Sequence, residues 1–222
     1  VVQALLDVVG PQGLVAMPGF STDAYPPANL DYSTLTAKQV AEIEHNVTGF
    51  NSARSSTRSM GAIAETFRCW PGTLRSQHPT TSICVNGAKA DDYSRDHGPA
   101  WSTGADSPFG QFLQRPNMKI LLIGVGWNRC TALHTAEFYA EPQRTKTRRF
   151  KTGPGDSPWR ETPDVADDMN RLFPDVGADF ENQGQVTRGR LGLADCRLCG
   201  FSDLIDFARP WISAANTKSG DL

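Results

Sequence analysis

The segment 131–137, with the sequence TALHTAE, carries a histidine and a carboxylate three residues apart. It follows an apolar run at 119–126 that is typical of a buried strand, and Thr131 favours the N-cap of a helix. A helix that begins there places His134 in its first turn and Glu137 on a similar face. Because the positive end of a helix disfavours an imidazolium ion, we expect a neutral His134 that can accept a proton. This pattern is typical of a general base, and a partly buried histidine bonded to backbone is the alternative.

A second histidine, His78, lies in the segment 75–82 (RSQHPTTS), directly before a proline. The residue before a proline is extended, so His78 is predicted to lie on a loop that enters a strand near Ser82. Loops of this kind often line binding sites, although a lone histidine in a loop is commonly structural or solvated. His45 and His97 occur in polar, irregular stretches and are expected to face solvent.

The cysteines and the acidic residues give no metal signature. Cys196 and Cys199 form a single C-x-x-C, and no further Cys or His residues occur at the spacing of a structural zinc site. An odd total of five cysteines is typical of reduced thiols in a cytoplasm. No local signature supports a nucleophile at Cys130, and the chain has no G-x-S-x-G elbow for a serine hydrolase. The acidic segment 159–168 lacks the alternation of a calcium loop and is either a solvated charge run or the source of a carboxylate that orients His134.

The whole chain of 222 residues has a formal net charge of −2, 39% hydrophobic residues, five Trp and eleven Phe. This length suits one compact domain, or one domain with an appended lobe, and the aromatic content suffices for a core. The near-neutral charge excludes the basic surface that nucleic acids select, and no apolar run reaches the roughly 20 residues of a membrane span. Residues 1–9 lack the basic flank of a secretory signal, so we predict a cytoplasmic protein without nucleic-acid or membrane partners.

Helical and strand-like segments alternate along the chain, which favours an α/β layered domain. The apolar run 119–126 is expected to be a central strand covered on both faces. Residues 20–58 are polar and are predicted to form a long surface excursion with a weak helix at 37–43. The other predicted elements are helices at 1–9, 60–68 (capped by Ser59), 131–141 and 202–211, and strands at 14–17, 82–85 and 144–151. The helix at residue 1 has no cap before it, so the native chain is expected to begin further upstream.

Five blocks of sequence are informative together: 60–72 (MGAIAETFRCWPG), 75–79 (RSQHP), 107–110 (SPFG), 124–137 (GVGWNRCTALHTAE) and 189–195 (GRLGLAD). In this order they resemble the aminoglycoside 3-N-acetyltransferases, the antibiotic N-acetyltransferase family whose fold is distinct from that of the GCN5-related enzymes. The segment 159–174 resembles the YokD-like branch, which includes phosphonate-biosynthesis members. The resemblance implies a single acetyltransferase domain over 1–222, with a layered sheet and helices on both faces. The family's first helix and its strand with a Ser-rich loop are missing, so this domain is expected to be N-terminally incomplete.

The resemblance implies direct transfer of an acetyl group from acetyl-CoA to an amine, at the 3-N position of an aminoglycoside. His134 matches the family's general base, and Thr131 is the candidate for polarising the thioester carbonyl. The carboxylate that orients His134 matches Asp164 best, with Glu161 as the alternative. Antibiotic resistance is the role that corresponds to this activity, and no metal is implied.

The resemblance also indicates residues for the cofactor and the substrate. The block at 75–82 lies near the cofactor in the family, which indicates as neighbours of the CoA arm Arg75, Ser76, His78 and Ser82. A cationic aminoglycoside requires an acidic pocket, for which the candidates are Glu137, Asp106 and Asp168. A phosphonate substrate would instead draw on basic residues, namely Arg58, Arg75 or Arg129.

Three other functions stay open at this point. One is a biosynthetic N-acetyltransferase for an amine of nucleotide or phosphonate type, and another is a hydrolase that uses Cys130 or a serine. The third is a non-catalytic α/β binding module in which His134 only caps a turn. The expected partner is a small-molecule amine, and the sequence leaves open whether the chain forms a homodimer.

Overall fold

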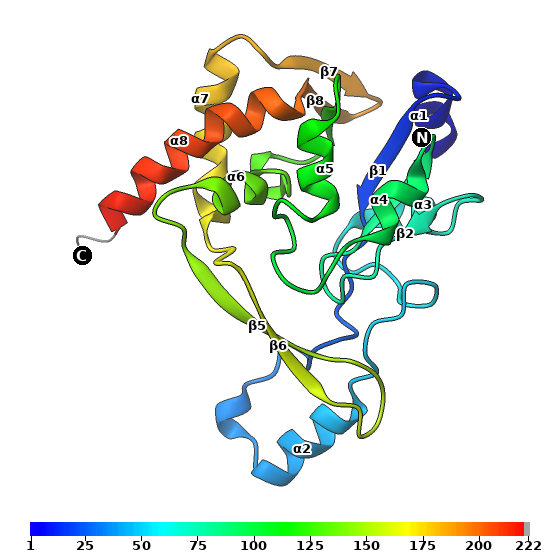
Figure 1. Ribbon diagram of the computed structural model, residues 1–222, viewed down its shortest axis with the longest axis vertical. Helices are drawn as coiled ribbons and strands as arrows, with labels where there is room; N and C mark the ends of the chain where they lie inside the picture. Colours follow the sequence, from blue (N-terminus) through cyan, green and yellow to red (C-terminus); the bar gives the residue numbers. More distant parts are fainter. Residues whose placement is uncertain (220–222) are drawn as a thin grey trace. The chain divides into compact units, whose positions relative to one another are not determined.

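The computed structural model describes residues 1–219, and the chain divides into two compact units. Unit 1 comprises Val1–Ser102 and Thr147–Thr162, and unit 2 comprises Thr103–Lys146 and the residues from Pro163 onwards. Helices and antiparallel strands occur in both units, so the protein is of the mixed α/β class that the sequence predicts (Figure 1). Within the described residues, no helix has the length and apolar content that a membrane span requires.

Unit 1 contains a three-stranded antiparallel sheet in the order β1-β3-β2, with Leu14 of β1 opposite Gly87 of β3. The elements of this unit are α1 (Val2–Val9), β1 (Leu14–Pro18), η1 (Tyr32–Thr34), α2 (Ala37–Asn46), α3 (Gly61–Arg68), β2 (Leu74–Arg75), β3 (Ile83–Gly87) and α4 (Ala90–Arg95). Val2 of α1 and Phe67 of α3 are buried with Cys84 of β3 in one core cluster. This burial of apolar surface explains why the two helices form where the periodicity predicts them.

The start of α3 differs from the prediction. The helix begins at Gly61 with Met60 as its N-cap and without a side-chain capping bond, so the predicted cap at Ser59 is wrong. Ser59 has a φ of 58°. A capping residue takes an extended conformation to aim its oxygen at the first N–H groups, and the left-handed backbone of Ser59 does not meet this requirement.

Unit 2 contains a second three-stranded antiparallel sheet, in the order β4-β8-β7. Its elements are α5 (Pro108–Gln114), β4 (Lys119–Ile123), η2 (Trp127–Arg129), α6 (Leu133–Tyr139), η3 (Met169–Arg171), α7 (Phe173–Asn182), β7 (Thr187–Leu191), β8 (Ala194–Gly200) and α8 (Phe201–Ser219). Helix α8 packs against α5, α6 and α7. Leu204 and Ile212 of α8 are buried, as are Leu133 of α6 and Phe180 of α7, on helices that pack together.

Strand β4 lies at one end of its sheet, so the prediction of a central strand covered on both faces is wrong for this sheet. Among the described strands it pairs only with β8. Leu121 is 40% exposed, whereas Leu122 on the opposite face is 7% exposed. An apolar run does not by itself distinguish an edge strand from a central one, because both bury at least one face.

Strands β5 (Thr145–Lys151) and β6 (Trp159–Val165) pair with each other. Residues of β5 that belong to unit 1 bond the C-terminal end of α2. The Lys151 ammonium is buried and donates to the carbonyls of Glu44 (2.7 Å) and His45 (2.8 Å) in the last turn of α2. Arg149 bonds the Glu44 carboxylate and stacks over the ring of Trp159. The Arg149 bond lowers the pKa of Glu44. A cation at a helix C-terminus satisfies the free carbonyls there, which explains why this polar segment has an ordered helix.

Candidate active site

The candidate base lies at the start of α6, in a run of consecutive turns. The N–H of Cys130 donates to the carbonyl of Trp127, and the N–H of His134 donates to the carbonyl of Thr131 (3.0 Å). The helix starts at Leu133, so the predicted N-cap at Thr131 is wrong, whereas the position of His134 in the first turn is confirmed. The residue before the helix, Ala132, has helical φ and ψ, because the chain enters α6 from a run of turns that begins with a 3₁₀ turn and not from an extended segment. Its methyl side chain cannot cap the helix.

Both ring nitrogens of His134 face carboxylates. Nδ1 bonds Oε2 of Glu137, and Nε2 lies 3.1 Å from Oδ1 of Asp167. The ring of Phe173 lies against the imidazole, with 5.0 Å between ring centroids. The His134 side chain is 13% exposed. The imidazole is therefore held on two edges and one face, and solvent reaches only a small part of it.

Glu137 is the more enclosed of the two carboxylates, at 5% exposure. Its Oε2 meets Nδ1 of His134, and its Oε1 has no hydrogen-bond partner within the described chain. A buried carboxylate with a single ring partner fixes the imidazole tautomer and stabilises positive charge on the ring. Glu137, for which the resemblance implies a contact with the substrate, is therefore the buried carboxylate that meets the ring at Nδ1.

Asp167 is the residue near the base that the sequence analysis did not single out. Its side chain is 28% exposed, its Oδ2 accepts a bond from Lys146 (3.0 Å), and its backbone is left-handed with a φ of 59°. The acidic segment 159–168 was recognised as a possible source of a carboxylate for His134. The fold determines which carboxylate of that segment reaches the ring.

The other predicted acidic residues lie elsewhere. Asp164 is buried in β6, where its Oδ1 accepts a bond from the N–H of Val165 (2.9 Å), and Glu161 is exposed on the same strand. Asp168 is exposed and paired with Arg144. Asp106 is exposed in the turn before α5. The carboxylates that contact His134 are thus not the two that the resemblance favours for orienting it.

The predicted cofactor residues at 75–82 form an interior network of unit 1. Ser76, His78 and Ser82 are fully buried. The Oγ of Ser82 donates to the carbonyl of Gly19 (2.7 Å) and accepts a bond from Arg75 (2.9 Å). The Nδ1 of His78 accepts the N–H groups of residues 80 and 81. These bonds tie the three side chains and Arg75 to their own loop, whereas the buried Nε2 of His78 has no hydrogen-bond partner among the described residues.

His97 belongs to the same interior, so its predicted solvent exposure is wrong. It is 4% exposed, with Nδ1 bonded to Oγ of Ser76 (2.8 Å) and Nε2 2.9 Å from the carbonyl of Ser102. Its ring lies 4.7 Å from that of His78, centroid to centroid. The polar sequence around His97 did not indicate exposure, because Ser76, which is distant in the sequence, and the carbonyl of Ser102 bond the ring in place of water. His45 is exposed, as predicted.

The buried His78 makes stability depend on pH. Burial lowers its pKa well below the ordinary value, and the neighbouring His97 and Arg148 act in the same direction. In the unfolded chain His78 titrates near 6.5, so below about pH 6.5 the unfolded state binds the proton more readily and stability falls by about 1.4 kcal/mol per pH unit from this group. We expect His78→Asn, which keeps an acceptor for the two N–H groups, to lose less stability on acidification than the wild type. Urea unfolding at about pH 7.5 and about pH 5.5 checks this, and equal losses in both proteins would contradict it.

The cysteines do not provide a nucleophile at this site. Cys130 is 2% exposed, and burial raises its pKa to about 12. Burial also raises the pKa of Cys199 to about 11. All five cysteines are free thiols. Because the thiolate is the reactive form, a hydrolase that uses Cys130 is disfavoured.

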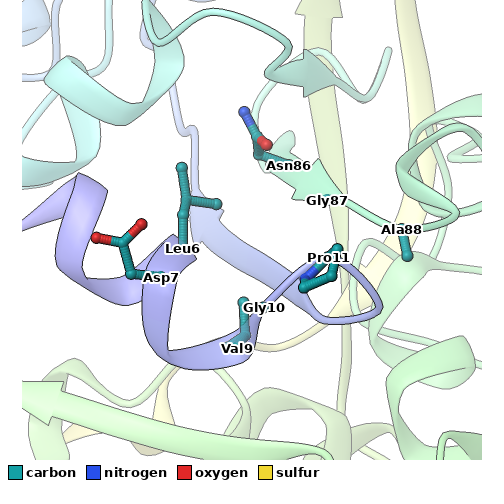
Figure 2. Close-up of a pocket in the computed structure, with 8 residues that line it drawn as sticks. All are labelled: Leu6, Asp7, Val9, Gly10, Pro11, Asn86, Gly87 and Ala88. Carbon is teal, nitrogen blue, oxygen red and sulfur yellow. The ribbon is translucent and has the colours of Figure 1, made fainter.

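A cavity of about 630 Å³ opens in unit 1 beside the end of α1 (Figure 2). Leu6 and Val9 of α1 form an apolar wall with Pro11, and Asp7 and Asn86 add polar groups. The lining includes no residue predicted to serve catalysis, cofactor or substrate. The candidate site is therefore located by the side-chain chemistry around His134 and not by this cavity.

Known proteins match the chain over nearly its whole length. The family described as aminoglycoside 3-N-acetyltransferase matches residues 1–213. The chain is 29% identical to the SPbeta prophage-derived aminoglycoside N(3')-acetyltransferase-like protein YokD of Bacillus subtilis (strain 168) over 221 residues, which cover 99% of this chain and 80% of YokD. It is 28% identical to aminoglycoside N(3)-acetyltransferase III of Pseudomonas aeruginosa over 222 residues, with 96% of this chain and 80% of that protein covered.

Solved structures of such proteins share the fold. The crystal structure of YokD from Bacillus subtilis has a TM-score of 0.88 at 29% identity, over 98% of this chain and 80% of YokD. AAC-IIIb in a binary complex with CoASH has a TM-score of 0.81 at 28% identity, over 96% of this chain and 82% of AAC-IIIb. AAC-VIa bound to sisomicin has a TM-score of 0.78 at 26% identity, over 96% of this chain and 83% of AAC-VIa. The chain therefore belongs to the aminoglycoside 3-N-acetyltransferase family and is an acyltransferase of that kind.

Proposed function

We propose that this protein transfers an acetyl group directly from acetyl-CoA to an amine of an aminoglycoside, at the 3-N position, with His134 as the general base. The observation that carries the proposal is the imidazole held between the buried carboxylate of Glu137 and the partly exposed carboxylate of Asp167. The solved relatives with CoASH and with sisomicin support the choice of donor and acceptor.

The Glu137 contact prepares the ring for proton transfer. In the neutral ring that donates its Nδ1 proton to Glu137, Nε2 carries a lone pair, and it can accept a proton when a bound ammonium ion comes between it and the Asp167 carboxylate. The buried carboxylate then stabilises the imidazolium that forms. The sequence-based candidate for this orienting role, Asp164, bonds a backbone N–H of its own strand. Glu137 is therefore the orienting residue in this proposal.

Asp167 supplies the negative charge that a cationic substrate requires. A primary amine is protonated near pH 7, so it reaches the site as an ammonium ion. The Asp167 carboxylate lies 3.1 Å from Nε2 and is partly exposed, so an ammonium ion bound there lies beside the nitrogen that removes its proton. The Lys146 ammonium bonds the other oxygen of Asp167, Oδ2, which leaves Oδ1 to face the substrate ammonium. Asp168 and Asp106, both exposed, are the further candidates for contacts with a polycationic substrate.

The reaction then follows from the positions of these groups. Nε2 of His134 takes a proton from the ammonium, and the free amine attacks the thioester carbon. The carbon–sulfur bond breaks, the thiolate of CoA leaves, and the imidazolium returns the proton to it. The ring, neutral again, then takes the second proton from the acylated nitrogen and releases it to solvent, so the products are the amide, the CoA thiol and one proton. Thr131, partly exposed one turn before His134, is the proposed donor to the oxygen that becomes negative. The proposal that residues 75–82 serve the CoA arm rests on the family resemblance, because their side chains are bonded within unit 1.

The direct test is to incubate the purified protein with acetyl-CoA and a panel of aminoglycosides. Release of CoA thiol, together with a product heavier by one acetyl group, is the expected result. Thiol release without any amine would indicate a hydrolase instead. Acetylation of nucleotide- or phosphonate-type amines but not of aminoglycosides would favour the biosynthetic alternative. Binding without thiol release for every amine would contradict the proposal and favour a binding module.

A further inference from the structure

We propose that one face of α7 positions the catalytic base through Trp127, which makes Trp127, Gly177 and Glu181 positioning residues for acetyl transfer. The inference rests on the proposed role of His134. All the residues involved lie in unit 2. Three features of the packing between α7 and Trp127 support this role.

The first feature is the spacing of three α7 residues along one face of the helix. Phe173, Gly177 and Glu181 follow one another at intervals of four residues, so they share a face of the helix. Phe173 lies against the ring of His134. Glu181 and Gly177 both contact Trp127, which begins η2 immediately before the site. One helix face therefore contacts both ends of the segment from Trp127 to His134.

The second feature is the close approach of Gly177 to the indole of Trp127. A Cβ atom added at residue 177 would overlap Cγ and both adjoining ring carbons of Trp127. Glycine inside a helix lowers helix stability relative to alanine. The close contact with Trp127 explains why a glycine occupies this helical position nevertheless. Phe180, in the next turn, meets the indole edge to face at 87°. Trp127 is 5% exposed, so the indole is confined on several sides.

The third feature is the anchoring of the indole nitrogen. Nε1 of Trp127 donates to Oε1 of Glu181 at 2.7 Å. Glu181 also accepts bonds from Arg188 and Arg197, which fix its carboxylate. Burial alone would raise the pKa of Glu181, but its hydrogen bonds to Arg188, Trp127 and Arg197 outweigh burial and leave that pKa below its usual value. The carboxylate therefore stays charged and keeps a strong bond to the indole.

Backbone bonds connect the indole to the base. The N–H of Cys130 donates to Trp127, that of Leu133 donates to Cys130, and that of His134 donates to Thr131. A shift of Trp127 thus moves the start of α6 and with it the imidazole. Displacement of a catalytic group by about 1 Å lowers the rate by roughly 10²-fold, although no contact with the substrate is lost.

The experiment compares two variants at this contact with a matched control on the same helix. Trp127→Phe removes the indole N–H, and Gly177→Ala forces the indole to move. The control is Trp211→Phe, because Trp211 of α8 donates its indole N–H to Asp179 of α7 at 2.8 Å on the protein surface. It removes the same kind of indole–carboxylate bond to α7 at a residue outside the segment from Trp127 to His134.

We expect Trp127→Phe to lower kcat by roughly tenfold and Gly177→Ala by up to about a hundredfold, with the KM for the amine within about twofold of the wild type. A second readout is independent of activity: the carbon-13 ring signal of His134, assigned by its loss in His134→Gln, should shift in Trp127→Phe and stay unchanged in Trp211→Phe.

An unchanged kcat and an unchanged His134 signal in Trp127→Phe would overturn the inference, even if Gly177→Ala fails to fold. The same holds if Trp211→Phe reproduces both effects, because the cause would then be general loss of α7 stability. Failure of the proposed function is distinguishable, since the wild type would then release no CoA thiol with any amine while the ring signal still reports the position of His134.

Discussion

His134→Gln is expected to lower kcat for acetyl transfer by roughly 10²–10⁴-fold, the range that a positioned general base contributes. Glutamine fills a similar volume, but its amide cannot take up a proton near neutral pH, so the bound ammonium keeps its proton and does not attack the thioester. The ring contact with Phe173 is replaced by amide packing, and folding should persist because the side chain is not in the fully buried core. Steady-state thiol release at saturating acetyl-CoA and amine measures the effect.

The matched control for this variant is His45→Gln. His45 is an exposed histidine in unit 1, with a 3.5 Å ion pair to the exposed Asp156. It should retain wild-type kcat, which separates the loss of the base from any general effect of removing an imidazole. Near-normal turnover by a folded His134→Gln protein would remove His134 from the chemistry, whatever the family relationship.

Glu137→Gln is expected to lower kcat by up to about 10⁴-fold, because replacing the carboxylate that orients a catalytic histidine has this effect when it leaves the wrong tautomer. The amide can turn its N–H₂ group towards Nδ1, which would place the imidazole proton on Nε2 and block the base. Even with its oxygen towards Nδ1, the neutral amide does not stabilise an imidazolium in a buried position. Thermal unfolding of the variant shows whether the substitution leaves the protein folded.

Asp167→Asn is the informative comparison for this prediction. If Asp167 binds the substrate ammonium, its amide variant raises the KM for the amine more than it lowers kcat. Glu137→Gln should show the opposite pattern, with a large fall in kcat and little change in KM. The assignment of the two carboxylates would have to be exchanged if the two variants showed each other's patterns.

The sequence predicted those parts of the site that depend on local spacing. His134 and Glu137 are three residues apart, and a helix brings such residues to one face whatever surrounds it. The apolar periodicity of α1 likewise predicted a helix, because burying one apolar face is its main driving force. The order of the sequence blocks predicted the family, which the match over residues 1–213 confirms.

Features that depend on tertiary structure were not predictable in this way. Asp167 reaches His134 from a different part of the chain, and nothing in its local sequence distinguishes it from Asp164 or Asp168. His97 is buried because its ring nitrogens bond two residues of the folded chain. Ser76 is distant from it in the sequence, and Ser102 lies in an irregular turn. The capping propensity of threonine predicted an N-cap at Thr131, but the turns that precede α6 place its first residue at Leu133.

The left-handed backbone at residue 167 limits evolutionary change at that position independently of charge. Among the standard amino acids, glycine, asparagine and aspartate adopt a φ near 59° at low cost, and aspartate alone of these brings a negative charge. A glutamate would strain the chain despite its carboxylate. The residue types that can replace Asp167 as the acceptor substrate of the enzyme changes are therefore very few.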